Sequence, residues 1–111
     1  MKVEQLKNCK LLADEEDGIK SFASFLQFII PRAHKNDNLI VDLLKYKDIQ
    51  LMDMLAFLEI SNKHRSQKKS FVLVNDVLRP DNIPEELMIV PTVQEAQDVV
   101  DLELIQRDLG F

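Results

Sequence analysis

The sequence predicts one α/β domain over residues 1–111, with a mixed four- to five-stranded sheet packed with about three helices. Short β-branched runs alternate with longer segments whose apolar residues recur at helical spacing, which is typical of this class. The length is near the commonest domain size, and no internal repeat or linker divides the chain.

The N-terminal residues are predicted to form a β-hairpin. Residues 2–6 and 9–13 have the length of short strands, and Lys7-Asn8 would join them. Asparagine tolerates the left-handed backbone that a tight hairpin turn requires. An uncovered strand at the hairpin edge could pair with a second copy of the chain, so a homodimer is one candidate assembly.

A helix is expected after the hairpin, with Asp17 as its cap. Four apolar residues recur there at helical spacing. They are Ile19, Phe22, Leu26 and Ile29. Pro31 predicts the end of the helix, because a proline disfavours helical geometry at the residue before it.

Two further strands and a helix are expected in the middle of the chain. The apolar run 39–44 suits a strand covered on both faces, as in a parallel sheet, and 71–74 is similar. The helix between them runs from Leu51 to near residue 66. Leu55 and Leu58 are assigned to its core-facing stripe, where truncating either to alanine would cost about 2–5 kcal/mol.

The C-terminal part should contain a loop over residues 75–84, a short strand over 87–90 and a last helix. Thr92 and Glu95 have the spacing of a capping box at the start of that helix. The face that it buries should contain Val93, Ala96, Val100 and Leu104. Gly110 suits a left-handed cap after the helix.

From residue 39 to about 100, the order and spacing of these segments resemble the STAS domain, found in anti-sigma-factor antagonists and at the ends of sulfate transporters. The segments that carry the resemblance are 39–43, the apolar helix, 71–75 and 89–96. The resemblance implies the STAS scaffold and a non-catalytic role in protein–protein regulation. It also implies partner contacts at the start of the middle helix and in the loop before it.

The phosphorylation switch of that family is not expected here. Antagonist members carry a phosphorylated serine in a turn that falls on residues 50–53 of this chain. No serine or threonine lies between Leu43 and Ile60, so nothing there can accept the phosphate charge. The implied partner surface comprises Tyr46, Gln50, Leu51, Met52, Asp53 and Met54.

The apolar members of this surface have two readings. Methionine-rich surfaces suit adaptable binding, and exposed large apolar groups mark interfaces. A Met/Leu stripe at helical spacing is also typical of a core. Exposure of Leu51 and Met52 would favour the partner surface, and burial of both would count against it.

An alternative function follows from the charge distribution. The net charge is −5, yet residues 85–111 carry −6 and the rest carries +1. The one basic cluster contains Lys63, Arg65, Lys68 and Lys69, the candidates for an RNA-associated accessory protein. The chain end, Asp-Leu-Gly-Phe, resembles that of short bacterial chains sometimes named for a tRNA-end-processing nuclease, so such a nuclease is a candidate partner. Nucleic acid is the less favoured partner, because four phosphate contacts give a salt slope of only about −3 to −4.

No catalytic or metal-binding constellation is visible. His34 and His64 have no other histidine or cysteine at ligand spacing, and both are expected at the surface. Cys9 should behave as a small buried hydrophobe. The chain is therefore not expected to be an enzyme or to need a cofactor. Its longest uncharged stretch, 21–31, is too short to cross a bilayer, and a cytoplasmic location is expected.

Overall fold

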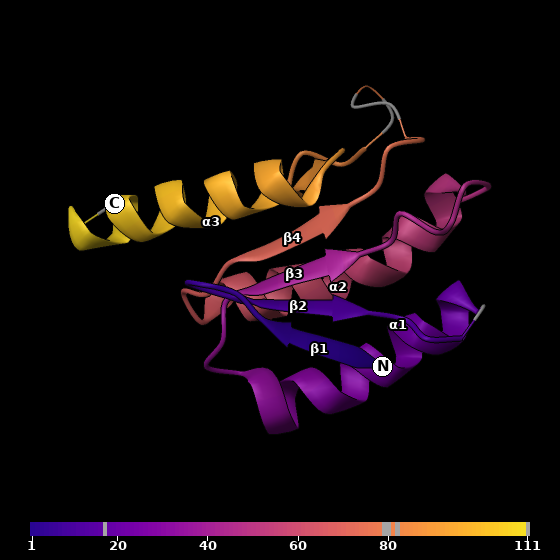
Figure 1. Ribbon diagram of the computed structural model, residues 1–111, viewed down its shortest axis with the longest axis horizontal. Helices are drawn as coiled ribbons and strands as arrows, with labels where there is room; N and C mark the ends of the chain where they lie inside the picture. Colours follow the sequence, from indigo (N-terminus) through magenta and orange to yellow (C-terminus); the bar gives the residue numbers. More distant parts are fainter. Residues whose placement is uncertain (17, 79–80, 82, 111) are drawn as a thin grey trace.

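The computed structural model describes residues 1–16, 18–78, 81 and 83–110. Its strands form one mixed sheet in the order β1-β2-β3-β4-β5 (Figure 1). They are β1 (Lys2–Gln5), β2 (Lys10–Ala13), β3 (Leu39–Asp42), β4 (Phe71–Val74) and β5 (Ile89–Val90). The hairpin pair β1–β2 is antiparallel and the other pairs are parallel, which confirms the predicted fold class.

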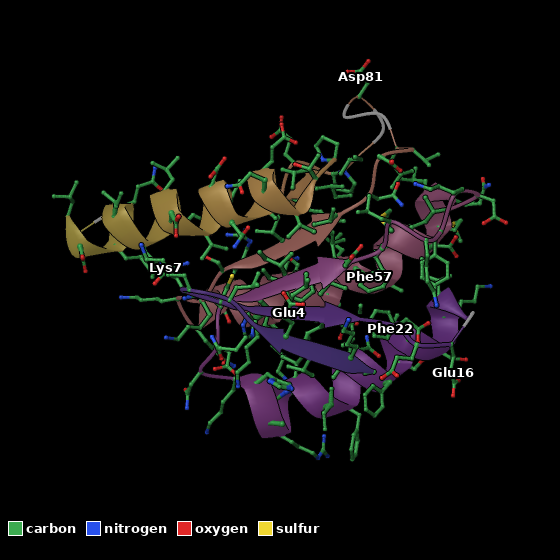
Figure 2. All side chains as sticks on the ribbon, in the orientation of Figure 1. Glu4, Lys7, Glu16, Phe22, Phe57 and Asp81 are labelled. Carbon is green, nitrogen blue, oxygen red and sulfur yellow. The ribbon has the colours of Figure 1, made fainter. Side chains whose placement is uncertain are left out.

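Helices cover both faces of the sheet. They are α1 (Ile19–Ile29), α2 (Leu51–Ser66) and α3 (Val93–Asp108). Side chains alternate across a strand, so Leu39 and Val41 pack with α1 and α2, whereas Ile40 packs with α3. Phe22 from α1 and Phe57 from α2 fill the larger of the two cores (Figure 2). The central strands are thus buried on both faces, as their apolar runs predict.

The hairpin is shorter than predicted, because the chain leaves the ladder after Gln5 and rejoins it at Lys10. The Leu6 N–H donates to the Cys9 carbonyl at 2.8 Å and closes the turn. Cys9 is buried as expected, and burial raises the pKa of its thiol. All four residues of β1 are exposed at the sheet edge.

The α-helical part of α1 ends at Ile29, before Pro31 as predicted, but the chain continues in a wider π-helical turn over Ile30–His34. A wider turn accommodates a proline, which has no N–H to donate and a ring that crowds the preceding turn of a regular helix. The predicted cap, Asp17, lies outside the described residues. Gly18 occupies the N-cap position with an extended backbone.

The predicted core stripe of α2 is wrong at Leu55, which is 44% exposed. Leu58 is partly buried and packs against the larger core, and Met54 and Phe57 are completely buried. Apolar residues occupy most positions from 51 to 60, so their spacing does not select one face. Packing against the sheet selects the face instead.

The last helix agrees closely with its prediction. The Thr92 hydroxyl accepts a hydrogen bond from the Glu95 N–H at 3.1 Å, as in a capping box. Ala96 and Val100 are buried against the sheet. Gly110 follows the helix with a φ of +87°. The strand that precedes α3 is shorter than the predicted 87–90, because only Ile89–Val90 of β5 pairs with β4.

Candidate functional site

Two loops meet where α2 begins, at the carboxyl ends of β3 and β4, and Asn75 joins them. Its buried side chain donates from Nδ2 to the carbonyls of Leu43 at 3.0 Å and Tyr46 at 3.1 Å. Its Oδ1 accepts from the N–H groups of Val77 at 2.9 Å and Leu78 at 3.3 Å. One side chain therefore fixes the segment that leads into α2.

Gln50 and Asp53 hold the first turn of α2. The Asp53 carboxylate accepts a hydrogen bond from the Gln50 N–H at 2.9 Å. The Gln50 side chain donates to the Asp48 carbonyl at 3.0 Å. An acid in this position also interacts favourably with the helix dipole. Both predicted site residues thus position the start of α2, rather than standing free for a partner.

Three apolar side chains are exposed on the first two turns of α2. Leu51 is 43% exposed, Met52 is 75% exposed, and Leu55 joins them. Met54 is completely buried, so it leaves the predicted partner surface. We call Leu51, Met52 and Leu55 the α2 patch.

The α2 patch adjoins a small hollow between α1 and α2. The hollow has a volume of about 150 Å³ and is lined by Ile19, Lys20, Met52, Asp53 and Ala56. The sequence reasoning missed Ile19 and Leu55 as members of this surface. A signal for Leu55 existed, because it follows Leu51 by four residues and so shares its helix face.

Tyr46 anchors the loop before α2 to the loop after β2. Its hydroxyl donates to the Asp14 carboxylate, and its ring is partly buried against the larger core. The neighbouring Lys45 ammonium donates to the Asp14 carbonyl at 3.1 Å. The predicted contact residue therefore has a packing role in the structure.

The basic cluster separates into two parts. Lys63 lines a hollow of about 300 Å³ between α1 and α2. Arg65, Lys68 and Lys69 line a different hollow, and Arg107 of α3 joins them there. Sequence spacing gave no signal for Arg107, because it lies 38 residues beyond Lys69 in the acidic part of the chain.

Both histidines are buried, which contradicts their expected exposure. His34 Nδ1 lies 3.1 Å from the Asp37 carboxylate, and His64 donates from Nε2 to the Asp37 carbonyl at 2.7 Å. Lys10 also pairs with Asp37, at 3.1 Å. Burial opposes ionisation of Asp37, but its hydrogen bonds from His34 and Lys10 prevail and lower its pKa. The histidines therefore anchor the turn before β3.

His64 should make the fold sensitive to mild acid. Burial lowers its pKa below the ordinary 6.5, because the imidazolium is desolvated. As the pH is lowered through about 6.5, this histidine is protonated in the unfolded chain before it is protonated in the folded protein. The free energy of unfolding therefore decreases as the pH decreases, by at most about 1.4 kcal/mol per pH unit. We expect His64→Gln, which keeps a donor for the Asp37 carbonyl, to flatten this slope in urea unfolding at several pH values. An unchanged slope would contradict the assignment.

No known family model matches the chain, and no curated protein matches it. No helix within the described residues has the length and apolar character needed to cross a membrane. Over the same described ranges, no group of three or more histidine, cysteine, aspartate or glutamate side chains is placed to hold a metal ion.

Proposed function

We propose that the chain is a non-catalytic protein–protein interaction module, and that its partner binds the α2 patch. The exposure of Met52 carries the proposal, because a large apolar side chain three-quarters exposed beside two others is typical of an interface. The resemblance to STAS domains supports the same location, because it implies partner contacts at the start of α2. In such a role the protein would act in the cytoplasm as an anti-sigma-factor-antagonist-like regulator without the phosphorylation switch.

The surface around the α2 patch favours a partner that inserts an apolar side chain. The smaller hollow between α1 and α2, which adjoins the α2 patch, is lined by the apolar residues Ile19, Met52 and Ala56. One cation, Lys20, and one acid, Asp53, also line it. Opposite charges at this site nearly cancel, so affinity would come from apolar burial, and salt would change it little.

A second copy of the chain is a less suitable partner. The free edge of β1 carries Lys2 and Glu4, and charged side chains on a short edge strand discourage pairing with another strand. Sedimentation of the purified protein tests this point. A monomer at high concentration agrees with the proposal, whereas a dimer disrupted by the α2-patch variant below would assign the patch to self-association.

The main test is affinity capture from native lysate with the double variant Leu51→Asp/Met52→Asp. We expect a specific protein to be captured by the wild type and lost with this variant, because two carboxylates would be desolvated in the interface. The matched control is Leu102→Asp/Ile105→Asp, which places the same charges on two exposed apolar positions of α3. Circular dichroism verifies the folding of both variants.

Two outcomes would contradict the proposal. One is a captured protein that binds the two double variants equally and, when purified, binds them with equal affinity. The other is RNA as the only specific companion, released as salt rises, which would favour an RNA-associated accessory protein. The second outcome has less support, because Lys63 lies apart from the other basic residues and Arg65 is held in an ion pair with Glu103.

A further inference from the structure

The end of α2 leads into the start of β4, beside which α3 runs (Figure 1). A basic hollow lies at this place. It has a volume of about 510 Å³. Its lining residues are Arg65, Lys68, Lys69, Glu103, Gln106, Arg107 and Gly110. The 16 residues of α2 span about 24 Å at 1.5 Å per residue, so the hollow and the α2 patch lie at opposite ends of that helix.

Among the described residues that line the hollow, Glu103 is the one carboxylate, and neighbouring donors already pair with it. Glu103 pairs with Arg65 at 3.0 Å and with Arg107 at 3.6 Å. It also accepts a hydrogen bond from the buried Ser70 hydroxyl at 2.5 Å. The Ser70 oxygen in turn accepts from Arg107 Nη2 at 2.7 Å. This network holds the Arg107 guanidinium in place, and the other nitrogens of that group have no partner among the described residues.

Two lysines line the hollow, Lys68 and Lys69. Within the described part of the chain, their ammonium groups make no ion pair and no hydrogen bond. Lys68 also has a φ of +63°, a left-handed conformation in which glycine is the favoured residue at a helix end. The backbone of Lys68 thus adopts an unfavourable conformation while its side chain adds a positive charge to the hollow.

The positive charge exceeds what the helix ends require. Of the described lining residues, four are cations and Glu103 is an anion, and the carboxyl ends of α2 and α3 each contribute roughly −0.5 of an elementary charge. A surplus of about +2 remains, in a protein whose net charge is −5. A phosphate monoester or pyrophosphate group carries the complementary charge, and arginine and lysine are the side chains that bind it.

We propose that this hollow binds the phosphate groups of a small phosphorylated molecule, with Arg107, Lys68 and Lys69 as its contacts. A nucleic acid strand fits less well, because its backbone would extend past the acids that α3 exposes outside the hollow, such as Asp98 and Asp101. The site is independent of the α2 patch, so either proposal can fail alone.

Titration calorimetry with inorganic pyrophosphate tests the proposal. We expect saturable binding at one site that weakens as salt rises. Arg107→Gln and Lys68→Gly should each weaken it on the order of tenfold, the equivalent of one charge-assisted hydrogen bond. Lys68→Gly keeps the fold because glycine readily adopts a positive φ. The matched control is Lys63→Gln, which removes a lysine outside the hollow and should leave the affinity unchanged.

Three results would overturn the proposal. The first is the absence of saturable pyrophosphate binding at low salt. The second is equal loss of affinity in the Lys63→Gln and Lys68→Gly variants, since a general effect of net charge would explain it. The third is binding of a single-stranded RNA oligonucleotide without binding of pyrophosphate, which would transfer the basic residues to nucleic acid.

Discussion

Phe57→Ala is expected to lower the free energy of unfolding by about 3–5 kcal/mol, whereas Leu55→Ala should cost roughly 1 kcal/mol or less. Phe57 is completely buried between α2 and the sheet, so its truncation leaves a cavity. Leu55 keeps nearly half of its surface in water, and alanine has the higher helix propensity. The apolar spacing alone would predict a large loss at Leu55.

Urea unfolding of the two variants measures this difference, with Phe57→Leu as the conservative control of intermediate cost. The result also bears on function. If Leu55→Ala cost as much as Phe57→Ala, the helix would present Leu55 to the core, and the α2 patch would not exist as described. A small loss at Leu55 together with a large one at Phe57 would support the orientation on which the proposed function depends.

The elements whose ends are marked by local chemistry could be predicted from the sequence. Thr92 and Glu95 satisfy backbone groups within one turn, so the start of α3 depends on no distant contact. Pro31 likewise ends the regular part of α1 wherever the rest of the chain lies. The buried strands β3 and β4 were recognisable because both of their faces are apolar.

Features that depend on distant contacts could not be predicted. Arg107 lines the basic hollow because the C-terminal end of α3 packs beside the start of β4. The spacing of residues in the sequence does not indicate this contact. The buried side chain of His64 bonds to the Asp37 carbonyl, which comes from a segment 27 residues away. The orientation of α2 was ambiguous for a different reason. Apolar residues occur on all sides of its first three turns, so only packing against the sheet determines which face is buried.

Asn75→Ala is expected to destabilise the fold by about 3 kcal/mol, although it removes no apolar contact. The variant removes four hydrogen bonds from the adjoining loops, and the Val77 and Leu78 N–H groups lose the Asn75 acceptor. A buried polar group that loses its partner costs about 1–3 kcal/mol. Water can reach some of these groups, which keeps the total below the sum. Asn36→Ala is the matched control, because Asn36 is exposed and should change stability by less than about 0.5 kcal/mol.

Asn75→Asp separates the roles of the two side-chain atoms. The carboxylate keeps an acceptor for Val77 and Leu78 but turns a negative oxygen toward the carbonyls of Leu43 and Tyr46. Burial and these carbonyls should raise the pKa of the new carboxyl group in the folded state. The folded variant then binds the proton more tightly than the unfolded chain. Its loss of unfolding free energy relative to wild type should therefore become smaller as the pH decreases and the carboxyl group is protonated.

Denaturant unfolding of wild type, Asn75→Ala and Asn75→Asp at neutral and acidic pH tests both expectations, and amide hydrogen exchange locates the loss. Faster exchange should appear first in the loops after β3 and β4, because Asn75 joins them, and then at the first turn of α2. An Asn75→Asp deficit that does not change with pH would show that the carbonyls do not face the new carboxylate. Loss of exchange protection that reaches the first turn of α2 would show that one buried amide holds the start of that helix, and with it the exposed position of Met52, whereas a loss confined to the loops would contradict this role.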